Sequence, residues 1–127
     1  MVLVLDSGGL SYLATRSSQA VALIRSLRRE ELWPPVIPTM VLVESLQARP
    51  GRDAALNQFI GTCLVDDSVP VTLARRAAEL RRAARKGSAV DALVMALAEP
   101  NGAVLTGDVG DLRALAAQTK QVAVIGV

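Results

Sequence analysis

Short, continuously apolar runs alternate along the whole chain with longer stretches whose apolar residues recur at helical spacing. An apolar run closed by turn residues is typical of a strand buried on both faces, and the longer stretches are typical of amphipathic helices. Proline, glycine and serine mark the boundaries. We therefore expect strands at Val2–Leu5, Val36–Ile37, Cys63–Val65, Ala103–Leu105 and Val122–Ile125, and helices at Gly8–Ala14, Gln19–Leu32, Met40–Ala48, Asp53–Gly61, Val71–Lys86, Ala89–Glu99 and Val109–Ala117.

This alternation predicts an α/β fold, a five-stranded parallel sheet covered by helices on both faces. The 127 residues contain no repeat or linker, so we expect one domain over residues 1–127. Ser17 or Ser18 is expected to cap the second helix and Thr39 the third, with Pro38 closing the strand before it.

The composition excludes several kinds of chemistry. The chain has no histidine and one cysteine, Cys63, so Ser-His and Cys-His nucleophiles and an internal disulfide are excluded. Neither a signal peptide nor an apolar segment of about 20 residues is present, so we expect a cytoplasmic protein without membrane association. The net charge of +2 does not by itself indicate a nucleic-acid partner.

Acidic side chains from separate segments are predicted to meet at one edge of the sheet. Asp6 follows the first strand, and Asp108 and Asp111 follow the fourth. Asp91 is in the first turn of the helix that leads into the fourth strand, and Glu44 is early in the helix after the second. Since ligands of doubly wound sheets bind beyond the carboxyl ends of the strands, this edge is the expected site.

Most of these acids also have a purely structural interpretation. Asp91 with Ser88 fits a capping box, and Asp108 fits a cap for the following helix. Asp111 suits the positive end of that helix, while Asp6 suits the amides of a turn. The sequence alone leaves these alternatives open.

Glu44 is the most informative acid because it lies among apolar neighbours, where an unpaired carboxylate is costly. Two like charges about 4 Å apart repel by roughly 4 kcal/mol at an effective dielectric near 20, so the cluster needs protons or a cation. Oxygen ligands favour Mg²⁺ or Mn²⁺, which activates water without histidine. Ser7 and Thr106 are auxiliary candidates for orienting water or ligands, or are turn residues.

Four segments resemble the PIN-domain ribonucleases, and most closely the toxins of VapBC toxin–antitoxin pairs. They are VLDSGGL at the N-terminus, VLVESL around Glu44, VDALVMALA from Val90 and VLTGDVGDL from Val104. The resemblance implies a five-stranded parallel sheet, Mg²⁺-dependent RNA cleavage, a homodimer and an antitoxin that blocks the site. It assigns metal binding and catalysis to Asp6, Glu44, Asp91 and Asp108, with Asp111 auxiliary.

The predicted helix at Val71–Lys86 is strongly basic. Its positive residues are either a solvated face or a wall that binds RNA phosphates. Base stacking is expected to contribute little, because Tyr12, Trp33 and Phe59 are the only aromatic residues. The candidate phosphate contacts are Arg75, Arg82, Arg85 and Lys86.

Other α/β classes fit less well. A receiver-like domain has paired acids near its N-terminus, whereas Asp6 has no acidic neighbour. A haloacid-dehalogenase-like phosphatase needs a second Asp where this chain has Gly8. A PIN-like or receiver-like binding module without activity stays open as the alternative, since a fold does not fix a function.

Overall fold

The computed structural model describes residues 1–127 as a five-stranded, all-parallel sheet of order β3-β2-β1-β4-β5 with seven helices. The predicted α/β class is therefore confirmed. Receiver domains have the strand order 2-1-3-4-5, which this sheet does not share. The elements are β1 Leu3–Leu5, α1 Ser7–Ala14, α2 Ser18–Arg29, β2 Val36–Pro38, α3 Thr39–Ser45, α4 Pro50–Ile60, β3 Leu64–Asp66, α5 Val71–Ala84, α6 Ala89–Ala98, β4 Ala103–Thr106, α7 Gly110–Ala116 and β5 Ala123–Gly126.

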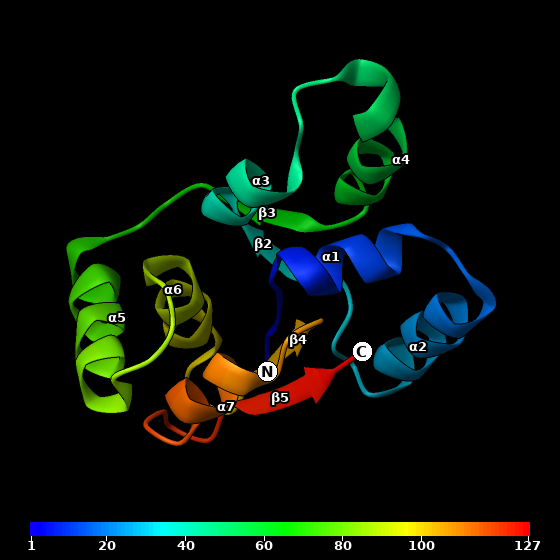
Figure 1. Ribbon diagram of the computed structural model, residues 1–127. Coiled ribbons are helices and arrows are strands. Elements are labelled where there is room, and N and C mark those ends of the chain that lie inside the picture. The colour runs from blue at the N-terminus through cyan, green and yellow to red at the C-terminus, as the bar shows by residue number, and fades with distance from the viewer.

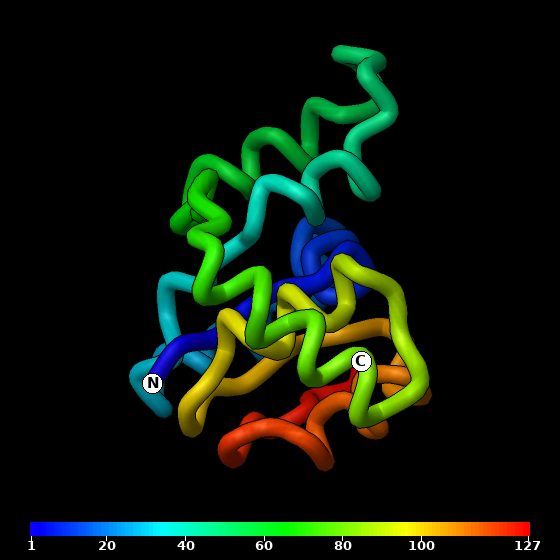
Figure 2. Tube along the Cα trace, turned by 90° about the vertical axis from the view of Figure 1, so that its left-hand side faces the viewer, coloured from blue at the N-terminus to red at the C-terminus, as the bar shows by residue number.

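Helices cover both faces of the sheet, as the alternating pattern predicts. Helices α5, α6 and α7 pack together on one side, and α1 and α2 pack on the other (Figure 1). Helices α3 and α4 lie at the top of Figures 1 and 2, where both contact α1. None of the seven helices has the length and apolar composition that crossing a bilayer requires.

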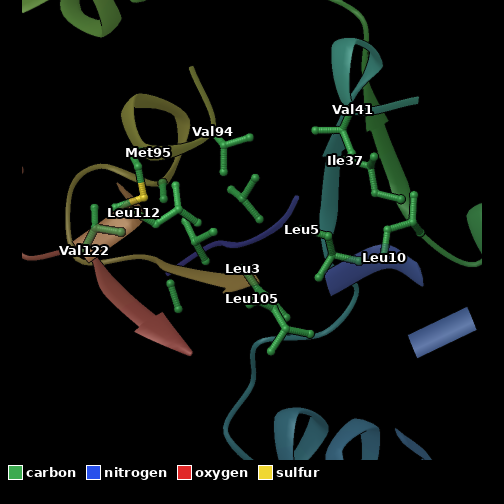
Figure 3. Packing of buried hydrophobic residues seen from close by; sticks show 14 of the residues in the cluster. Leu3, Leu5, Leu10, Ile37, Val41, Val94, Met95, Leu105, Leu112 and Val122 are labelled. Atoms are coloured by element: carbon green, nitrogen blue, oxygen red, sulfur yellow. The ribbon is translucent and has the colours of Figure 1, made fainter. Parts of the chain in front are cut away.

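The core is aliphatic and is centred on the two middle strands. All residues of β1 and β4 are buried, and helix α6 is buried along most of its length. Figure 3 shows Leu3, Leu5 and Leu105 between side chains from helices on either side, among them Leu10 and Met95. This packing fixes the ends of β1 and β4 beside each other.

Helix α2 ends at Arg29, so the prediction that it continues to Leu32 is wrong. Glu31 has a left-handed conformation, with φ of 60°. The N–H of Leu32 donates to the carbonyl of Leu27, and the N–H of Glu31 donates to that of Arg28. These bonds form a Schellman motif, which ends a helix even though glycine is absent here.

The predicted boundary between α3 and α4 is also wrong. Helix α3 ends at Ser45 rather than Ala48, and α4 begins at Pro50 rather than Asp53. Asp53 is buried, and its carboxylate accepts hydrogen bonds from the N–H groups of Gln47 and Arg49, which stabilise a loop between the helices. Pro50 occupies the first helical position, where a missing N–H has no effect.

The predicted helix caps are correct in two cases and wrong in one. Ser17 caps α2 by accepting from the N–H of Ala20. Ser88 and Asp91 form the expected capping box, with both bonds 3.0 Å long. Thr39 is instead the first residue of α3 and caps nothing, because the chain enters the helix directly from Pro38.

A bidentate ion pair holds α5 to the turn before β4. The guanidinium of Arg76 donates to both carboxylate oxygens of Glu99 at 2.8 Å, and the N–H of Lys120 donates to one of them. The Glu99 side chain is only 9 % exposed. The hydrogen bond from Arg76 is the main reason that the pKa of Glu99 is lowered.

We expect Glu99→Gln to reduce the free energy of unfolding by about 2 kcal/mol in urea denaturation at pH 7, because the charge-assisted bonds are lost. Since the pKa of Glu99 is lowered in the folded state, its stabilisation is complete above its ordinary pKa of 4.5 and declines as the pH falls through the lowered value. The wild-type advantage should therefore shrink in acid. Glu79→Gln, which removes a carboxylate that is 66 % exposed, is the control and should change stability by less than about 0.5 kcal/mol.

Candidate active site

The sheet topology brings the acidic segments together. Strand β1 lies between β2 and β4, so their three carboxyl ends are adjacent. Asp6 directly follows β1, and Asp108 comes two residues after β4. Helix α6, which leads into β4, starts at the same edge and carries Asp91 in its first turn.

These residues line a polar pocket of about 400 Å³. Four carboxylates take part in the lining, while Glu44 does not. The other lining residues supply a hydroxyl, two stretches of bare glycine backbone and one apolar contact. The complete lining is Asp6, Ser7, Gly8, Asp91, Gly107, Asp108, Asp111 and Leu112.

Asp6 and Asp91 have the structural roles that the sequence allowed, whereas the suggestion that Asp108 caps α7 is wrong, because the N-cap of α7 is Val109 and has no side-chain cap bond. All three acids line the pocket. An oxygen of Asp6 accepts from the N–H of Gly9 at 2.8 Å, which caps α1. Asp91 closes the capping box of α6, and Asp108 accepts from the N–H of Gly110 at 3.1 Å. Each of these bonds uses one carboxylate oxygen, so capping orients the group without occupying both oxygens.

Thr106 is fully buried at the end of β4. Its hydroxyl accepts from the N–H of Asp108 and donates to the carbonyl of Asp108, both at 3.0 Å. Thr106 therefore shapes the turn that presents Asp108. The Thr106 side chain also lowers the pKa of Asp6, so it acts on the Asp6 carboxylate as well as on the backbone of Asp108.

The electrostatics of the pocket agree with crowded negative charge. Burial is the largest cause that raises the pKa of Asp6, and the charge of Asp91 raises it further. Hydrogen bonds from Thr106 and Gly9 act in the opposite direction. A carboxylate in this position is stabilised by a nearby cation.

Glu44 corrects one expectation. Its side chain is exposed on α3 and is not enclosed by the apolar neighbours that surround it in the sequence. Partial desolvation raises its pKa, and the charges of Asp91 and Asp6 raise it further, although Glu44 is not part of the pocket lining. The argument from its burial is therefore wrong, and the charges of Asp91 and Asp6 are what link it to the other acids.

Close contact between two glycines holds the Asp6 and Asp108 segments together. A Cβ atom on Gly8 would lie 2.7 Å from the backbone nitrogen of Gly107 and 3.0 Å from its Cα. Only a residue without a side chain permits this approach. The sequence reasoning did not single out Gly8 and Gly107, although the pairs Ser7-Gly8 and Thr106-Gly107 follow the two strands in a similar way.

The donor set suits a hard divalent ion, because every side-chain donor in the pocket is an oxygen. No group of three acidic side chains converges closely enough to hold one ion jointly. Mg²⁺ is commonly bound through one or two carboxylates and keeps several waters, and the 400 Å³ pocket has room for them. The residues therefore fit a hydrated Mg²⁺ or Mn²⁺ ion.

The basic residues of α5 divide into two groups. Arg76 is engaged by Glu99, and the Nε–H of Arg81 donates to the carbonyl of Gly87 at 3.2 Å. The remaining positive side chains on the helix and just after it are exposed and form no ion pair. They are Arg75, Arg82, Arg85 and Lys86, the four candidate phosphate contacts.

Solved structures share this fold, although no protein-family model and no curated protein sequence matches the chain. One match is the structure of VapBC2 from Rickettsia felis bound to a DNA fragment from the VapBC2 promoter. Its TM-score is 0.74 at 13 % identity, and the match covers 100 % of this chain and 99 % of that chain. FitAcB from Neisseria gonorrhoeae matches with a TM-score of 0.61 at 23 % identity, covering 99 % and 97 %. PAE2754 from Pyrobaculum aerophilum matches with a TM-score of 0.60 at 20 % identity, covering 98 % and 92 %.

The class of fold is thus the PIN-like α/β domain that the four motifs predict. The particular likeness is to VapBC2, whose fold this chain shares along its whole length. Identities of 13 % to 23 % establish the fold and leave the chemistry to the residues of this chain.

We expect Gly8→Ala to destabilise the protein by about 1–3 kcal/mol, because the new methyl group would meet backbone atoms of Gly107. Alanine normally stabilises a helix relative to glycine. A lower free energy of unfolding in urea denaturation would therefore identify the close contact as the cause. Gly51→Ala is the matched control: no atom lies within 4 Å of its Cβ position in the first turn of α4, and stability should rise by about 0.5 kcal/mol. Equal effects of the two substitutions would contradict this account.

Proposed function

We propose that the protein is a Mg²⁺- or Mn²⁺-dependent endoribonuclease. The observation that carries the proposal is the pocket lined by Asp6, Asp91, Asp108 and Asp111. The charges of Asp91 and Asp6 also raise the pKa of Glu44 on α3. A chain without histidine needs another means of activating water, and a cation among carboxylates supplies it.

In this proposal Asp6, Glu44, Asp91 and Asp108 hold the metal ion, directly or through its waters, and Asp111 assists. A bound divalent ion lowers the pKa of water and stabilises charge on a phosphate under in-line attack. The chain's own contribution is orientation. The caps of α1 and α6 fix Asp6 and Asp91, and Thr106 fixes the turn of Asp108. Ser7 lines the pocket and is available to orient a water molecule.

The exposed cations at the end of α5 support an RNA substrate. Arg85 and Lys86 immediately precede the Gly87-Ser88 turn that leads into the capping box of Asp91. Phosphates bound there would approach the pocket from its α5 side. The attraction between these side chains and RNA phosphates is independent of the RNA sequence and weakens as the salt concentration rises.

The likeness to VapBC2 supports a place in a toxin–antitoxin pair, with this chain as the toxin and a cognate antitoxin that covers the pocket. An arginine of such a partner suits a pocket lined by four carboxylates, because guanidinium and carboxylate form strong bidentate bonds. Exposed apolar side chains, among them Val43 on α3 and Leu64 and Val65 on the edge strand β3, support the homodimer. The expected location is the cytoplasm.

Asp6→Asn and Asp91→Asn should each reduce RNA cleavage about hundredfold or more, measured with labelled structured RNA in Mg²⁺. Asparagine still accepts the capping hydrogen bonds, so the fold should be retained and only the charge lost. Asp67→Asn is the control, because Asp67 is an exposed carboxylate outside the pocket. This variant should cleave RNA at the wild-type rate.

Removal of the metal completes this test. EDTA should abolish cleavage, and added Mg²⁺ or Mn²⁺ should restore it. Cleavage that continues in EDTA, or in Asp6→Asn at the wild-type rate, would refute the proposal. A folded protein that cuts no RNA under any condition would favour the inactive binding module.

A second prediction concerns α5. The double variant Arg82→Ala/Arg85→Ala should bind RNA more weakly in EDTA. The plot of the logarithm of the binding constant against the logarithm of the salt concentration should become less steep by about 1.4, since each phosphate contact on a single strand contributes about 0.7. Arg25→Ala/Arg29→Ala on α2 loses the same charge on exposed positions elsewhere and should leave the slope unchanged. Binding curves from filter retention at several salt concentrations make the comparison. Identical slopes for both double variants would show that α5 is only a solvated face.

A further inference from the structure

Two of the three aromatic residues of the chain meet at a second pocket, at the amino-terminal edge of the sheet. The rings of Trp33 and Phe59 are in edge contact, with centroids 6.1 Å apart and planes at 70°. Trp33 precedes β2, and Phe59 lies at the end of α4, which leads to β3. The pocket therefore opens at the opposite edge from the acidic one.

This aromatic pocket has a volume of about 200 Å³ and an apolar lining with cations on it. Leu13, Val21 and Ile24 contribute aliphatic walls, and Thr62 contributes a hydroxyl. Arg16 and Arg28 complete it. The volume suits one planar group rather than a large ligand.

The two arginines are free to bind an anion. Arg76 is the only positively charged residue that forms ion pairs in this structure, so neither Arg16 nor Arg28 has an acidic partner. The guanidinium carbon of Arg28 lies 5.4 Å from the centre of the Trp33 ring, within the range of a cation–π contact. A flat cation over an aromatic ring, beside a second free cation, has the chemistry for a base and its phosphate.

We propose that this aromatic pocket binds one unpaired nucleotide of the RNA substrate, with the base at Trp33 and Arg28 and the phosphate at Arg16. The inference extends the proposed function, since it takes RNA as the substrate. Helix α1 links the two sites: Asp6 caps its start and Arg16 follows its end, roughly 15 Å apart along the axis. A short single strand can span that distance, so the pocket holds RNA while the acidic edge receives the phosphodiester bond.

Trp33 is the only tryptophan, so its fluorescence reports on this pocket alone. In EDTA, where no cleavage occurs, oligouridylate should quench Trp33 emission to saturation in the wild type. The affinity, measured separately by anisotropy of labelled RNA, should fall about tenfold in Arg16→Ala/Arg28→Ala, the loss expected for one stacked base. Arg28→Lys should recover only part of it, because lysine keeps the charge and loses the planar stack.

The charge-matched control is Arg25→Ala/Arg29→Ala, which removes two exposed arginines of α2 that do not line the pocket. Its affinity should stay within about twofold of the wild type. An abasic oligonucleotide with the same number of phosphates should bind without quenching Trp33. Equal losses in the two double variants, or quenching by the abasic strand, would overturn the proposal and leave a diffuse electrostatic effect.

Two further results separate this inference from the nuclease. Quenching that persists in Asp6→Asn, which lacks cleavage, supports the pocket independently of catalysis. Cleavage by the wild type with no change in Trp33 emission overturns the pocket and leaves the nuclease intact. Quenching by oligoglutamate and not by RNA would also overturn it, and would assign the pocket to an acidic protein partner.

Discussion

The structure depends on one electrostatic constraint, the concentration of carboxylates where three parallel strands end. Strand β1 must lie between β2 and β4 to bury its apolar residues, and this brings Asp6, Asp91 and Asp108 to one pocket. Burial is the largest cause of the raised pKa values of Asp6 and Glu44, and repulsion from neighbouring carboxylates adds to it. The capping bonds of Asp6 and Asp91 offset part of this cost, and a bound cation would offset more of it.

Structural and chemical roles coincide in this pocket. The capping bonds of Asp6 and Asp91 stabilise α1 and α6, and the same bonds fix the direction of each carboxylate. The contact between Gly8 and Gly107 fixes the spacing of the two loops. A cap and a ligand are therefore not competing interpretations, because a carboxylate has two oxygens and each cap uses one of them.

The alternating pattern predicted every strand and helix, because the apolar runs of the strands and the apolar faces of the helices are recognisable in the local sequence. The expectation that each strand is buried on both faces is wrong for β3, where Leu64 and Val65 are exposed, because the strand order places β3 at the edge of the sheet. The ends of α2 and α3 were not predictable in this way. They depend on the left-handed Glu31 and on Asp53, which binds backbone groups of a neighbouring loop. Exposure of Glu44 was missed for a related reason: neighbours in sequence do not reveal which way a short helix projects. The meeting of Trp33 with Phe59 is likewise a tertiary contact between distant segments.

An acidic pocket cannot by itself attract a polyanion, and this limits how the proposed substrate would be held. Phosphate must approach four carboxylates, so a bound cation offsets only part of the repulsion. The binding energy has to come from outside the pocket, from groups that do not neutralise its charge. The free cations that precede Asp91 in the chain and the arginines at Trp33, at the opposite edge of the sheet, are not paired with the pocket carboxylates. Separate binding and reacting groups thus follow from the same crowding of charge that makes the pocket suitable for a metal ion.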